Sequence, residues 1–431
     1  MNLSEPLLSI FQRSTGVNTD TRSIQQGQLF VALKGPNFNG NLFAKQALDS
    51  GAVHLLLDEY PTCDLPEGCF SLVENGLKAL QDLAHAYRKT LSCQVIAIGG
   101  SNGKTTTKEL VTRVLATKFK TFATPGNLNN HIGVPLTLLR TPPDTEMLVV
   151  EMGANGPGEI AELCDIAAPD FGLITNIGKD HLEGFGSIEG VAAANSELFY
   201  YLFKHGGKAF VNTLEQHVAR MSSRFESAIT YPQAQDFCPV TWVDNGSFFL
   251  SYKDEHGQKV ETKLTGQYNF ANVATALCVG KYFGTESDKM HAAIAHYQPA
   301  NNRSQIVETG RNTIISDAYN ANPSSMEAAI ANFVTLRTEK KALFLGDMLE
   351  LGTQSEVEHG RIGELTSNPA FDLVGLVGKD MKFAADKNPK ALYFETPAKA
   401  LVWLKLNKLE GFTLLLKGSR GLKMEQLIEE L

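Results

Sequence analysis

A lysine and a threonine follow a glycine-rich turn in residues 95–110, VIAIGGSNGKTTTKEL. Apolar residues precede the turn, and a helix-like run follows it. A lysine at this place can neutralise the β- or γ-phosphate of a nucleotide, and the threonine hydroxyl can ligate Mg²⁺. Backbone amides at the start of a helix also favour anionic oxygens. The stretch therefore predicts a phosphate-binding loop in which Lys104 and Thr105 are the reactive groups.

The glycines of this loop depart from the usual spacing, which places one glycine, then four residues, before Gly-Lys-Ser/Thr. Residue 98, where the first glycine would fall, is isoleucine, and the glycines are at positions 99, 100 and 103. Gly100 and Gly103 can still turn backbone amides toward phosphate oxygens. A shortened or reshaped loop is the interpretation we prefer. The alternative is an ordinary strand–turn–helix whose glycines serve packing.

Two more polar residues follow apolar, strand-like runs. Glu151 ends the run 147–151, and His181 lies in NIGKDHLEGFGS after the run 171–176. The carboxyl ends of parallel strands face the crevice in which such sheets bind ligands. A carboxylate and an imidazole opposite a phosphate loop predict a metal site. Taken singly, a surface carboxylate and a structural histidine are the ordinary alternatives.

The elements that would position these residues form three successive α/β units. Apolar runs buried on both faces, alternating with helical periodicity, are typical of parallel sheets. We expect a first unit over residues 1–90, a central one over 91–299 and a third over 300–431. Within the central unit, residues 237–264 read as antiparallel strands with a hairpin turn at Asn245-Gly246. Expected strands are 28–33, 52–57, 93–98, 147–151, 171–176, 312–317, 342–345, 373–377 and 413–416; expected helices are 42–50, 76–90, 104–117, 157–166, 188–203 and 269–283, with Asn322-Pro323 starting another.

The overall composition argues against a nucleic-acid-binding protein and against a membrane-spanning one. The 431 residues carry a formal charge of −8 and 43% hydrophobic residues, which argues against a nucleic-acid-binding surface. Six scattered cysteines show no metal-ligand spacing and predict reduced, mostly buried thiols. No basic leader precedes the first apolar run, and no stretch of about 18 apolar residues predicts a membrane span. We expect a cytoplasmic protein.

A series of motifs occurs in a defined order: SNGKTTTKE, TPGNLNNHIGVP, EMGANGPGEI, NIGKDHLEGFGS, GQYNFANVATAL, NNRSQIVE, DAYNANPSSM, LGDMLELG and KGSRG, after TDTRSIQQGQLFVALKG near the N-terminus. Together they resemble the Mur ligase superfamily over nearly the whole chain. DAYNANPSSM and GDMLELG are most similar to the branch that adds D-alanyl-D-alanine to UDP-N-acetylmuramoyl-tripeptide.

The resemblance implies an α/β fold of three domains. These are an N-terminal domain for the UDP-linked substrate, a central P-loop ATPase with a mostly parallel sheet, and a C-terminal Rossmann-like domain. It further implies ATP and Mg²⁺ as cofactors, the UDP-linked tripeptide and D-alanyl-D-alanine as partners, and a monomer. The reaction would be an ADP-forming amide ligation through an acyl phosphate. Positive charge is needed where these anionic groups meet.

The resemblance also assigns roles to individual residues. Catalytic roles fall on Lys104, Glu151, His181 and Arg303, and metal ligation falls on Thr105, Glu151 and His181. ATP binding is implied for Gly100, Ser101, Asn102, Gly103, Lys104, Thr105, Thr106, Asn269, Asn272, Arg303 and Asp317. Substrate binding is implied for Thr21, Arg22, Lys34, Asn127, Asn129, Asn130, Tyr319, Asn320, Asn322, Lys417 and Ser419. Without the resemblance, Asn269 would be interpreted as a helix cap and Asn272 as a solvated polar residue.

The chain departs from its relatives at Asn195. Many of them carry there a lysine that CO₂ converts to a carbamate bridging a second metal. An amide cannot be carbamylated, so we expect the rate not to depend on bicarbonate. Gly99 and Asn39-Gly40-Asn41 are lesser departures. Two alternatives remain: another ligase of the superfamily, such as a folylpolyglutamate synthase, and a nucleotide-binding paralogue without catalysis.

Overall fold

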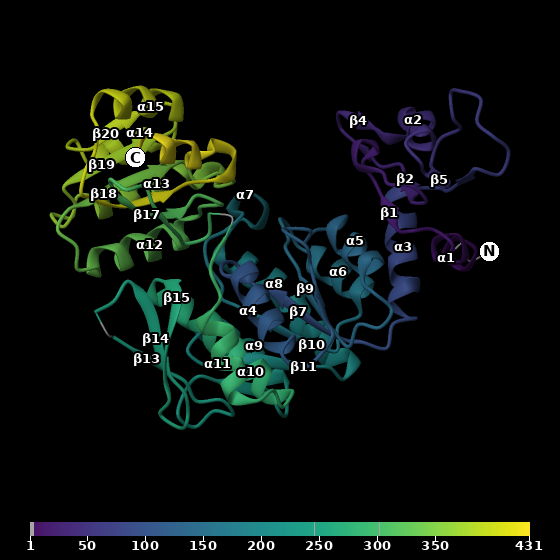
Figure 1. Cartoon of the computed structure of the whole chain (residues 1–431), viewed down its shortest axis with the longest axis horizontal. Coiled ribbons are helices and arrows are strands. Elements are labelled where there is room, and N and C mark those ends of the chain that lie inside the picture. Colours follow the sequence, from purple (N-terminus) through teal and green to yellow (C-terminus); the bar gives the residue numbers. More distant parts are fainter. Residues whose placement is uncertain (1–3, 245, 301) are drawn as a thin grey trace.

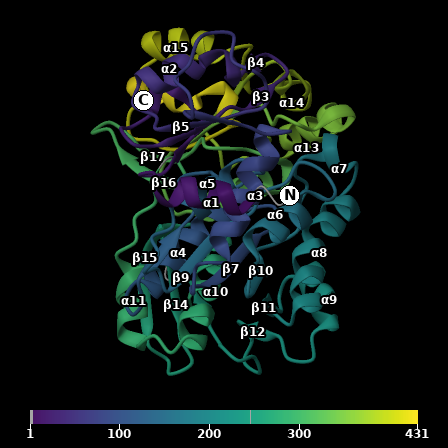
Figure 2. The same cartoon turned by 90° about the vertical axis from the view of Figure 1, so that its right-hand side faces the viewer.

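The computed structural model describes residues 4–244, 246–300 and 302–431. Figure 1 shows three α/β units: the purple N-terminal unit, the central unit, which runs from blue through teal to the green α10 and α11, and the green-to-yellow C-terminal unit. The first and third units both lie above the central unit, at its two ends (Figures 1 and 2). The predicted fold class is confirmed.

The N-terminal unit is built on a four-stranded parallel sheet in the order β1-β2-β5-β6. Leu55 and Leu57 face one side of the sheet and Leu56 the other, as the two-residue period of a strand requires. Its elements are α1 (Ser4–Gln12), β1 (Val17–Asn18), β2 (Leu29–Val31), the hairpin β3 (Lys34–Gly35) and β4 (Phe38–Asn39), α2 (Ala44–Asp49), β5 (His54–Leu57), β6 (Phe70–Leu72) and α3 (Gly76–Arg88).

Helix α3 fastens this unit to the central one. Leu80 and Leu83 are buried in one continuous cluster with Leu29 of the first sheet and Leu163 of the central unit. The buried Arg88 donates from Nε to the carbonyl of Ala167 at 3.0 Å. The first two units therefore share a hydrophobic core.

The central unit holds a six-stranded, wholly parallel sheet in the order β12-β11-β10-β7-β9-β8. Along β7, Val95 and Ala97 enter one buried cluster while Ile96 and Ile98 enter the other, so both faces are covered. Its elements are β7 (Gln94–Gly99), α4 (Lys104–Leu115), β8 (Thr121–Ala123), α5 (Gly133–Arg140), β9 (Met147–Glu151), α6 (Glu159–Ala167), β10 (Phe171–Ile174), α7 (Leu182–Phe185), α8 (Ile188–His205), β11 (Lys208–Asn212), α9 (Gln216–Met221), β12 (Ile229–Tyr231), α10 (Phe270–Tyr282) and α11 (Ser287–Ala295).

Three antiparallel strands, β13 (Thr241–Val243), β14 (Phe249–Lys253) and β15 (Lys259–Thr265), interrupt this pattern as expected. Of the predicted hairpin turn, Asn245 lies outside the described residues. The expected helix 157–166 begins instead at Glu159, because Gly158 has a left-handed backbone with φ +86°.

The C-terminal unit carries a six-stranded sheet in the order β16-β17-β21-β18-β19-β20, parallel except for β16. Leu343 and Leu345 of β18 face one buried cluster, and Ala342 and Phe344 the other, which gives the Rossmann-like layering that was expected. Its elements are β16 (Gln305–Glu308), β17 (Thr313–Asp317), α12 (Pro323–Thr335), β18 (Lys341–Gly346), α13 (Ser355–Thr366), β19 (Leu373–Val377), α14 (Met381–Lys387), β20 (Leu392–Phe394), α15 (Pro397–Leu406) and β21 (Thr413–Lys417).

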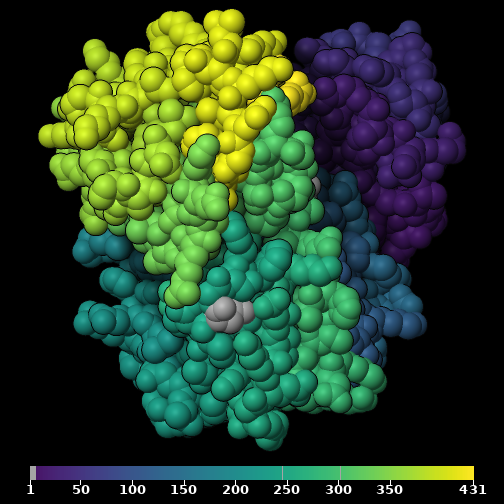
Figure 3. Space-filling model, turned by 60° about the vertical axis from the view of Figure 1, so that its left-hand side comes forward, coloured from purple at the N-terminus to yellow at the C-terminus, as the bar shows by residue number. Residues whose placement is uncertain are grey.

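The space-filling view shows the yellow C-terminal unit beside the purple N-terminal unit, with the central unit beneath both (Figure 3). In the part of the chain that the structure describes, no helix is both long and apolar enough to cross a membrane. The six cysteines are free, and four of them are buried.

Candidate active site

The glycine loop joins β7 to α4, as the sequence predicted. Gly100 and Gly103 have φ values of +115° and +80°, which favour glycine. A side chain would not fit at either position: a Cβ at Gly100 would lie 2.2 Å from the Thr175 hydroxyl, and one at Gly103 would lie 2.6 Å from Asn272 Oδ1. The loop therefore packs closely against Thr175 and Asn272, and the glycines at positions 100 and 103 determine its shape.

Lys104 and Thr105 open helix α4 directly after the loop. Lys104 Nζ donates to the carbonyls of Gly100, at 2.5 Å, and Ser101, at 3.1 Å. Thr105 Oγ1 donates to Glu151 Oε1 at 3.0 Å, and Asn129 Nδ2 donates to the same oxygen at 2.8 Å. The loop and the end of β9 therefore meet, as the topology of a parallel sheet predicted.

Glu151 has the properties of a metal ligand. Its side chain is buried, and among the described residues its second oxygen, Oε2, has no hydrogen-bond partner. A buried carboxylate oxygen without a partner is costly unless a cation or donor completes it. A carboxylate beside a threonine hydroxyl is an all-oxygen donor set, which suits Mg²⁺. No three His, Cys, Asp or Glu side chains of the described ranges converge on one point, so phosphate or water oxygens would have to supply the other ligands.

Asn195 lies on α8 underneath the loop. Its Oδ1 accepts the amide N–H of Gly100 at 2.7 Å, and its Nδ2 donates to the carbonyl of Val191 at 2.9 Å. The side chain is buried, and both of its polar atoms are used. Asn195, where the resemblance leads us to expect a lysine, therefore supports the phosphate loop.

Asn269 and Asn272 are both buried, and Asn272 lies next to Gly103. Asn272 Nδ2 donates to Asn269 Oδ1 at 2.8 Å, and Asn269 Nδ2 donates to the carbonyl of Thr265 at 2.7 Å. Asn269 occupies the N-cap position of α10, as interpreted without the resemblance, but its side chain makes no capping hydrogen bond. For Asn272 that interpretation is wrong, because α10 packs against α4 and the side chain is buried.

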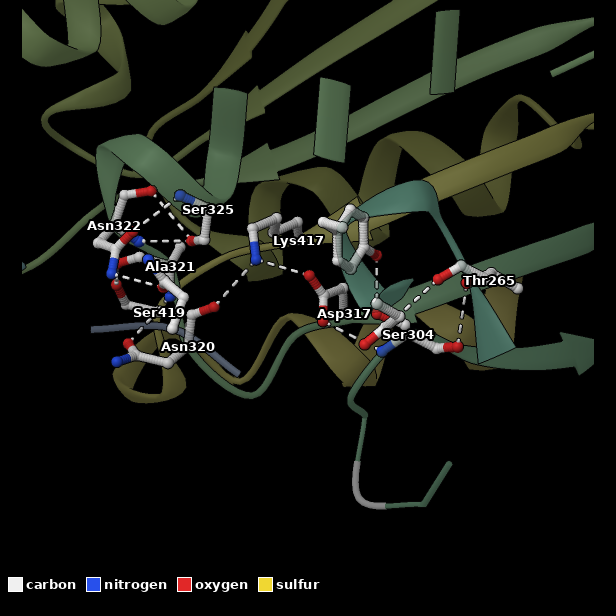
Figure 4. Close-up of polar contacts among 12 residues, drawn as sticks. Thr265, Ser304, Asp317, Asn320, Ala321, Asn322, Ser325, Lys417 and Ser419 are labelled. Carbon is white, nitrogen blue, oxygen red and sulfur yellow. Dashed lines mark hydrogen bonds and ion pairs between the residues drawn. The ribbon is translucent and has the colours of Figure 1, made fainter. Parts of the chain in front are cut away.

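The C-terminal unit contributes a second cluster of polar residues, shown in Figure 4. Lys417 Nζ lies 2.6 Å from Asp317 Oδ2 and also donates to the carbonyl of Asn320 at 3.2 Å. Asp317 Oδ1 accepts the amide of Ser304 at 3.1 Å. Ser419 Oγ accepts the amide of Leu349 at 3.0 Å, so its hydroxyl holds two loops together. Adjacent ends of β17 and β21 bring these residues to one sheet edge.

Tyr319 contacts two arginines in the same region. The guanidinium carbon of Arg303 is 3.6 Å from the centre of the Tyr319 ring, and that of Arg420 is 5.2 Å from it. Arg420 Nη1 also donates to the Tyr319 hydroxyl at 3.3 Å. Stacking on an aromatic face orients a guanidinium without neutralising it.

Polar contacts connect the C-terminal unit to the central one. Asn322 Nδ2 donates to Asn102 Oδ1 of the loop at 2.9 Å. His181 Nδ1 lies 2.5 Å from Glu350 Oε2, and Lys179 Nζ lies 2.5 Å from Glu358 Oε1. The residues around the predicted metal-binding histidine are therefore held by the third unit.

A cavity of about 670 Å³ lies between the two units. Most of the predicted site residues line it, from both units. Gly100 is not among the lining residues, because it lies on the buried side of the loop, against Asn195 and Thr175. The members from the sequence prediction are Ser101, Asn102, Gly103, Lys104, Thr105, Thr106, Asn127, Asn129, Asn130, Glu151, His181, Asn269, Asn272, Arg303, Asp317, Tyr319, Asn320, Asn322, Lys417 and Ser419.

Thr21, Arg22 and Lys34 do not line this cavity, since they lie on the N-terminal unit. Arg22 donates to Asp20 and holds the pKa of that carboxyl at about 2. Lys34 is paired with Glu59 at 2.8 Å and Asp58 at 3.1 Å, which raises the pKa of its ammonium.

The sequence prediction missed three charged residues that line the cavity. Asp180 accepts the Ser101 hydroxyl at 2.7 Å, Glu350 contacts His181, and Arg420 lies on Tyr319. Asp180 and Arg420 lie beside residues that were chosen, His181 and Ser419, whereas Glu350 lies in LGDMLELG, from which no site residue was chosen. The sequence signal that could have identified them is that each is a charged residue within one of the quoted motifs.

The fold and the site together define an ATP-dependent ligase of the three-domain kind. Residues 98–280 match the model of the Mur ligase middle domain, and residues 302–420 match that of the Mur ligase glutamate ligase domain. A UDP-N-acetylmuramoyl-tripeptide–D-alanyl-D-alanine ligase from Bacillus subtilis is 36% identical, with 96% of this chain and 93% of that one aligned. The corresponding Escherichia coli ligase is 34% identical over the same shares.

Solved structures agree with this comparison. MurF from Acinetobacter baumannii superposes with a TM-score of 0.88 at 28% identity, covering 99% of this chain and 98% of that one. MurF from Thermotoga maritima, solved in complex with ADP, gives 0.86 at 28% identity, covering 98% and 97%. The chain therefore belongs to the Mur ligases and, within them, to the MurF family.

Proposed function

We propose that this chain joins D-alanyl-D-alanine to UDP-N-acetylmuramoyl-tripeptide, converting ATP to ADP and phosphate, in cytoplasmic peptidoglycan precursor synthesis. The observation that carries the proposal is the cavity between two units. The wall formed by the central unit holds the phosphate loop and Glu151, whose Oε2 has no hydrogen-bond partner among the described residues, and the wall formed by the third unit holds three cationic side chains. The names of the relatives supply the substrates. We propose that the chain acts as a monomer, with domains over residues 1–90, 91–299 and 300–431.

The nucleotide would lie along the central wall. The amides of Ser101–Gly103 and the amine of Lys104 would bind the phosphates, and Arg303 would reach them from the third unit. Asn269 and Asn272 would contact the adenine, and Asp317 the ribose. An oxygen of the β-phosphate would accept from Lys104 Nζ in place of the loop carbonyls to which Nζ now donates.

Thr105 and Glu151 fit a magnesium ion through their oxygens, and the second ring nitrogen of His181 would hold another. Bound Mg²⁺ would neutralise the phosphate charge and bring carboxylate and γ-phosphate together. The contact of His181 with Glu350 supports this role, since a metal-binding histidine commonly donates its other ring N–H to a carboxylate.

The chemistry proceeds in two steps. A carboxylate oxygen of the tripeptide attacks the γ-phosphorus, and ADP leaves. The amine of the dipeptide then attacks the carbonyl carbon of the acyl phosphate, and phosphate leaves with the electron pair of the broken C–O bond. Lys104 and Arg303 would stabilise the charge on the transferred phosphoryl group. The third unit would exclude water that hydrolyses the acyl phosphate.

The larger substrate would extend from this cavity toward the N-terminal unit. Thr21, Arg22 and Lys34 would bind its uridine diphosphate end. Asn127, Asn129 and Asn130 would contact the peptide. Tyr319, Asn320, Asn322, Lys417 and Ser419 would form the part of the third unit that faces the dipeptide and the end of the tripeptide.

Phosphate release tests the proposal. The protein is incubated with ATP, Mg²⁺, UDP-N-acetylmuramoyl-tripeptide and D-alanyl-D-alanine, each also left out in turn. We expect phosphate release that requires both the tripeptide and the dipeptide. Release with glutamate and a folate in their place would instead identify another ligase of the superfamily, and no release with either pair would favour a nucleotide-binding regulator.

The variant Lys104→Ala serves as the first control. We expect it to lose at least about 100-fold in kcat, the order seen when a group that stabilises transition-state charge is removed, with its thermal unfolding unchanged. Turnover close to that of the unchanged protein would contradict the role given to Lys104.

A further inference from the structure

Arg420 and Arg303 line the cavity without forming an ion pair with any described carboxylate, whereas the other two cationic side chains, Lys104 and Lys417, are differently placed. The charge of Lys417 is balanced by Asp317 at 2.6 Å, with only 3% of the lysine side chain exposed. Lys104 is surrounded by loop carbonyls. No Asp or Glu of the described ranges forms an ion pair with Arg420, which is exposed at the cavity wall. Its guanidinium therefore keeps donors for an anion.

The backbone that carries Arg420 is fixed. Residue 420 follows the end of β21 and begins a short 3₁₀ helix, Arg420–Leu422. The preceding Ser419 is buried, and its hydroxyl binds the backbone of Leu349 and Ala321. The Tyr319 ring and hydroxyl then orient the guanidinium itself. A planar cation on a rigid support matches the two oxygens of a carboxylate.

The incoming dipeptide presents one such carboxylate. Its amine must remain free to attack, so the dipeptide can be recognised by charge only through its C-terminal carboxylate. Lys104 and Arg303 are assigned to the phosphates, and Lys417 is already neutralised. We propose that Arg420 binds the C-terminal carboxylate of the incoming D-alanyl-D-alanine, with Tyr319 as a positioning residue. This inference rests on the proposed function.

A comparison of two acceptors tests the inference. D-Alanyl-D-alanine and its C-terminal amide are assayed with the unchanged protein and with Arg420→Met. For the unchanged protein we expect the amide to have a kcat/KM lower by about 10- to 100-fold, the order of a hydrogen-bonded charge pair. Arg420→Met should lower kcat/KM for the dipeptide by a similar factor, mainly through KM, and should treat the two acceptors almost alike.

Controls separate this effect from a general loss. Lys423→Met removes a nearby cation of the same segment that does not line the cavity, and it should keep the preference for the free carboxylate. The KM for ATP and the unfolding temperature of Arg420→Met should match those of the unchanged protein. Arg420→Lys should recover part of the preference, because it restores charge without the planar fork.

The outcomes that overturn the inference differ from those that overturn the function. If the unchanged protein releases no phosphate with tripeptide and dipeptide, the proposed function fails. If it is active but Arg420→Met still prefers the free carboxylate by the same factor, the inference about Arg420 is wrong. A rise in KM for the UDP-linked tripeptide or for ATP, with the acceptor preference intact, also contradicts it.

Discussion

At the scale of single residues, Asn195 is the most informative departure from the relatives. Asn195→Ala would leave the buried amide of Gly100 without its acceptor, which costs about 1–3 kcal/mol. Because that amide fixes the phosphate loop, we expect a KM for ATP raised about 10-fold and a lower unfolding temperature. Ser196→Ala, which removes only an exposed hydroxyl one residue on, should change neither quantity.

Bicarbonate provides a second readout for the same residue. The rate of the unchanged protein should be the same with and without added bicarbonate, because the Asn195 amide cannot form a carbamate and already uses both polar atoms. A clear stimulation by bicarbonate would show that a lysine elsewhere in the chain forms the carbamate.

The sequence predicted which charged residues lie near the phosphate loop, but it did not predict which atoms of the site residues already have hydrogen-bond partners. Lys104, Thr105 and Glu151 were predictable, since strand order alone brings a loop and a neighbouring strand end together. The contacts of Asn195 and Asn272 depend on how α8 and α10 pack under the loop. That packing joins residues about 95 and 165 positions apart, and no local pattern encodes it.

At the scale of elements, the start of α12 has two functions. Asn322 Oδ1 accepts the amide of Ser325 at 2.8 Å and caps the helix, while its Nδ2 donates to Asn102 of the phosphate loop. Asn322→Ala should destabilise the protein by about 1 kcal/mol and also raise the KM for ATP. Asn322→Asp keeps the cap oxygen but not the donor.

The Asp variant therefore separates the two functions. We expect it to retain the unfolding temperature, measured by circular dichroism, while its KM for ATP rises as in the Ala variant. Equal KM values for Asn322→Asp and the unchanged protein would show that the contact with the loop has no part in nucleotide binding.

Most inner strands were easier to predict than edge strands, although the inner strand β11 was not expected. Strands β7, β9, β18 and β19 were expected at almost their observed bounds, because strands buried on both faces are continuous apolar runs. The three-residue strands β8 and β12 at the edges of the central sheet were not expected, since so short a run carries no distinct period. Tertiary pairing determines such strands.

At the scale of the whole molecule, the C-terminal unit is held to the central one mainly by polar contacts. The buried Glu358 pairs with Lys179 through Oε1, while its Oε2 has no partner among the described residues. Lys179→Met should therefore destabilise the protein by about 1–2 kcal/mol, because it leaves a buried charge unpaired.

The double variant Lys179→Met/Glu358→Gln tests this account by urea unfolding. Removing the buried charge as well should restore part of the lost stability, so the two changes are not additive. If the double variant is as unstable as the sum of the single ones, the two side chains are not coupled.

The position of Leu182 affects how many ATP molecules are hydrolysed for each amide bond formed. It belongs to the central unit, next to His181, yet it is buried in the hydrophobic cluster of the C-terminal unit. His181 itself has a left-handed backbone with φ +45° and contacts Glu350. Because Leu182 is buried in the third unit, the backbone of the neighbouring His181 is held in place. Leu182→Ala should raise the number of ATP molecules hydrolysed per amide bond formed, measured as phosphate against ligated product, because the site would then form without full protection from water.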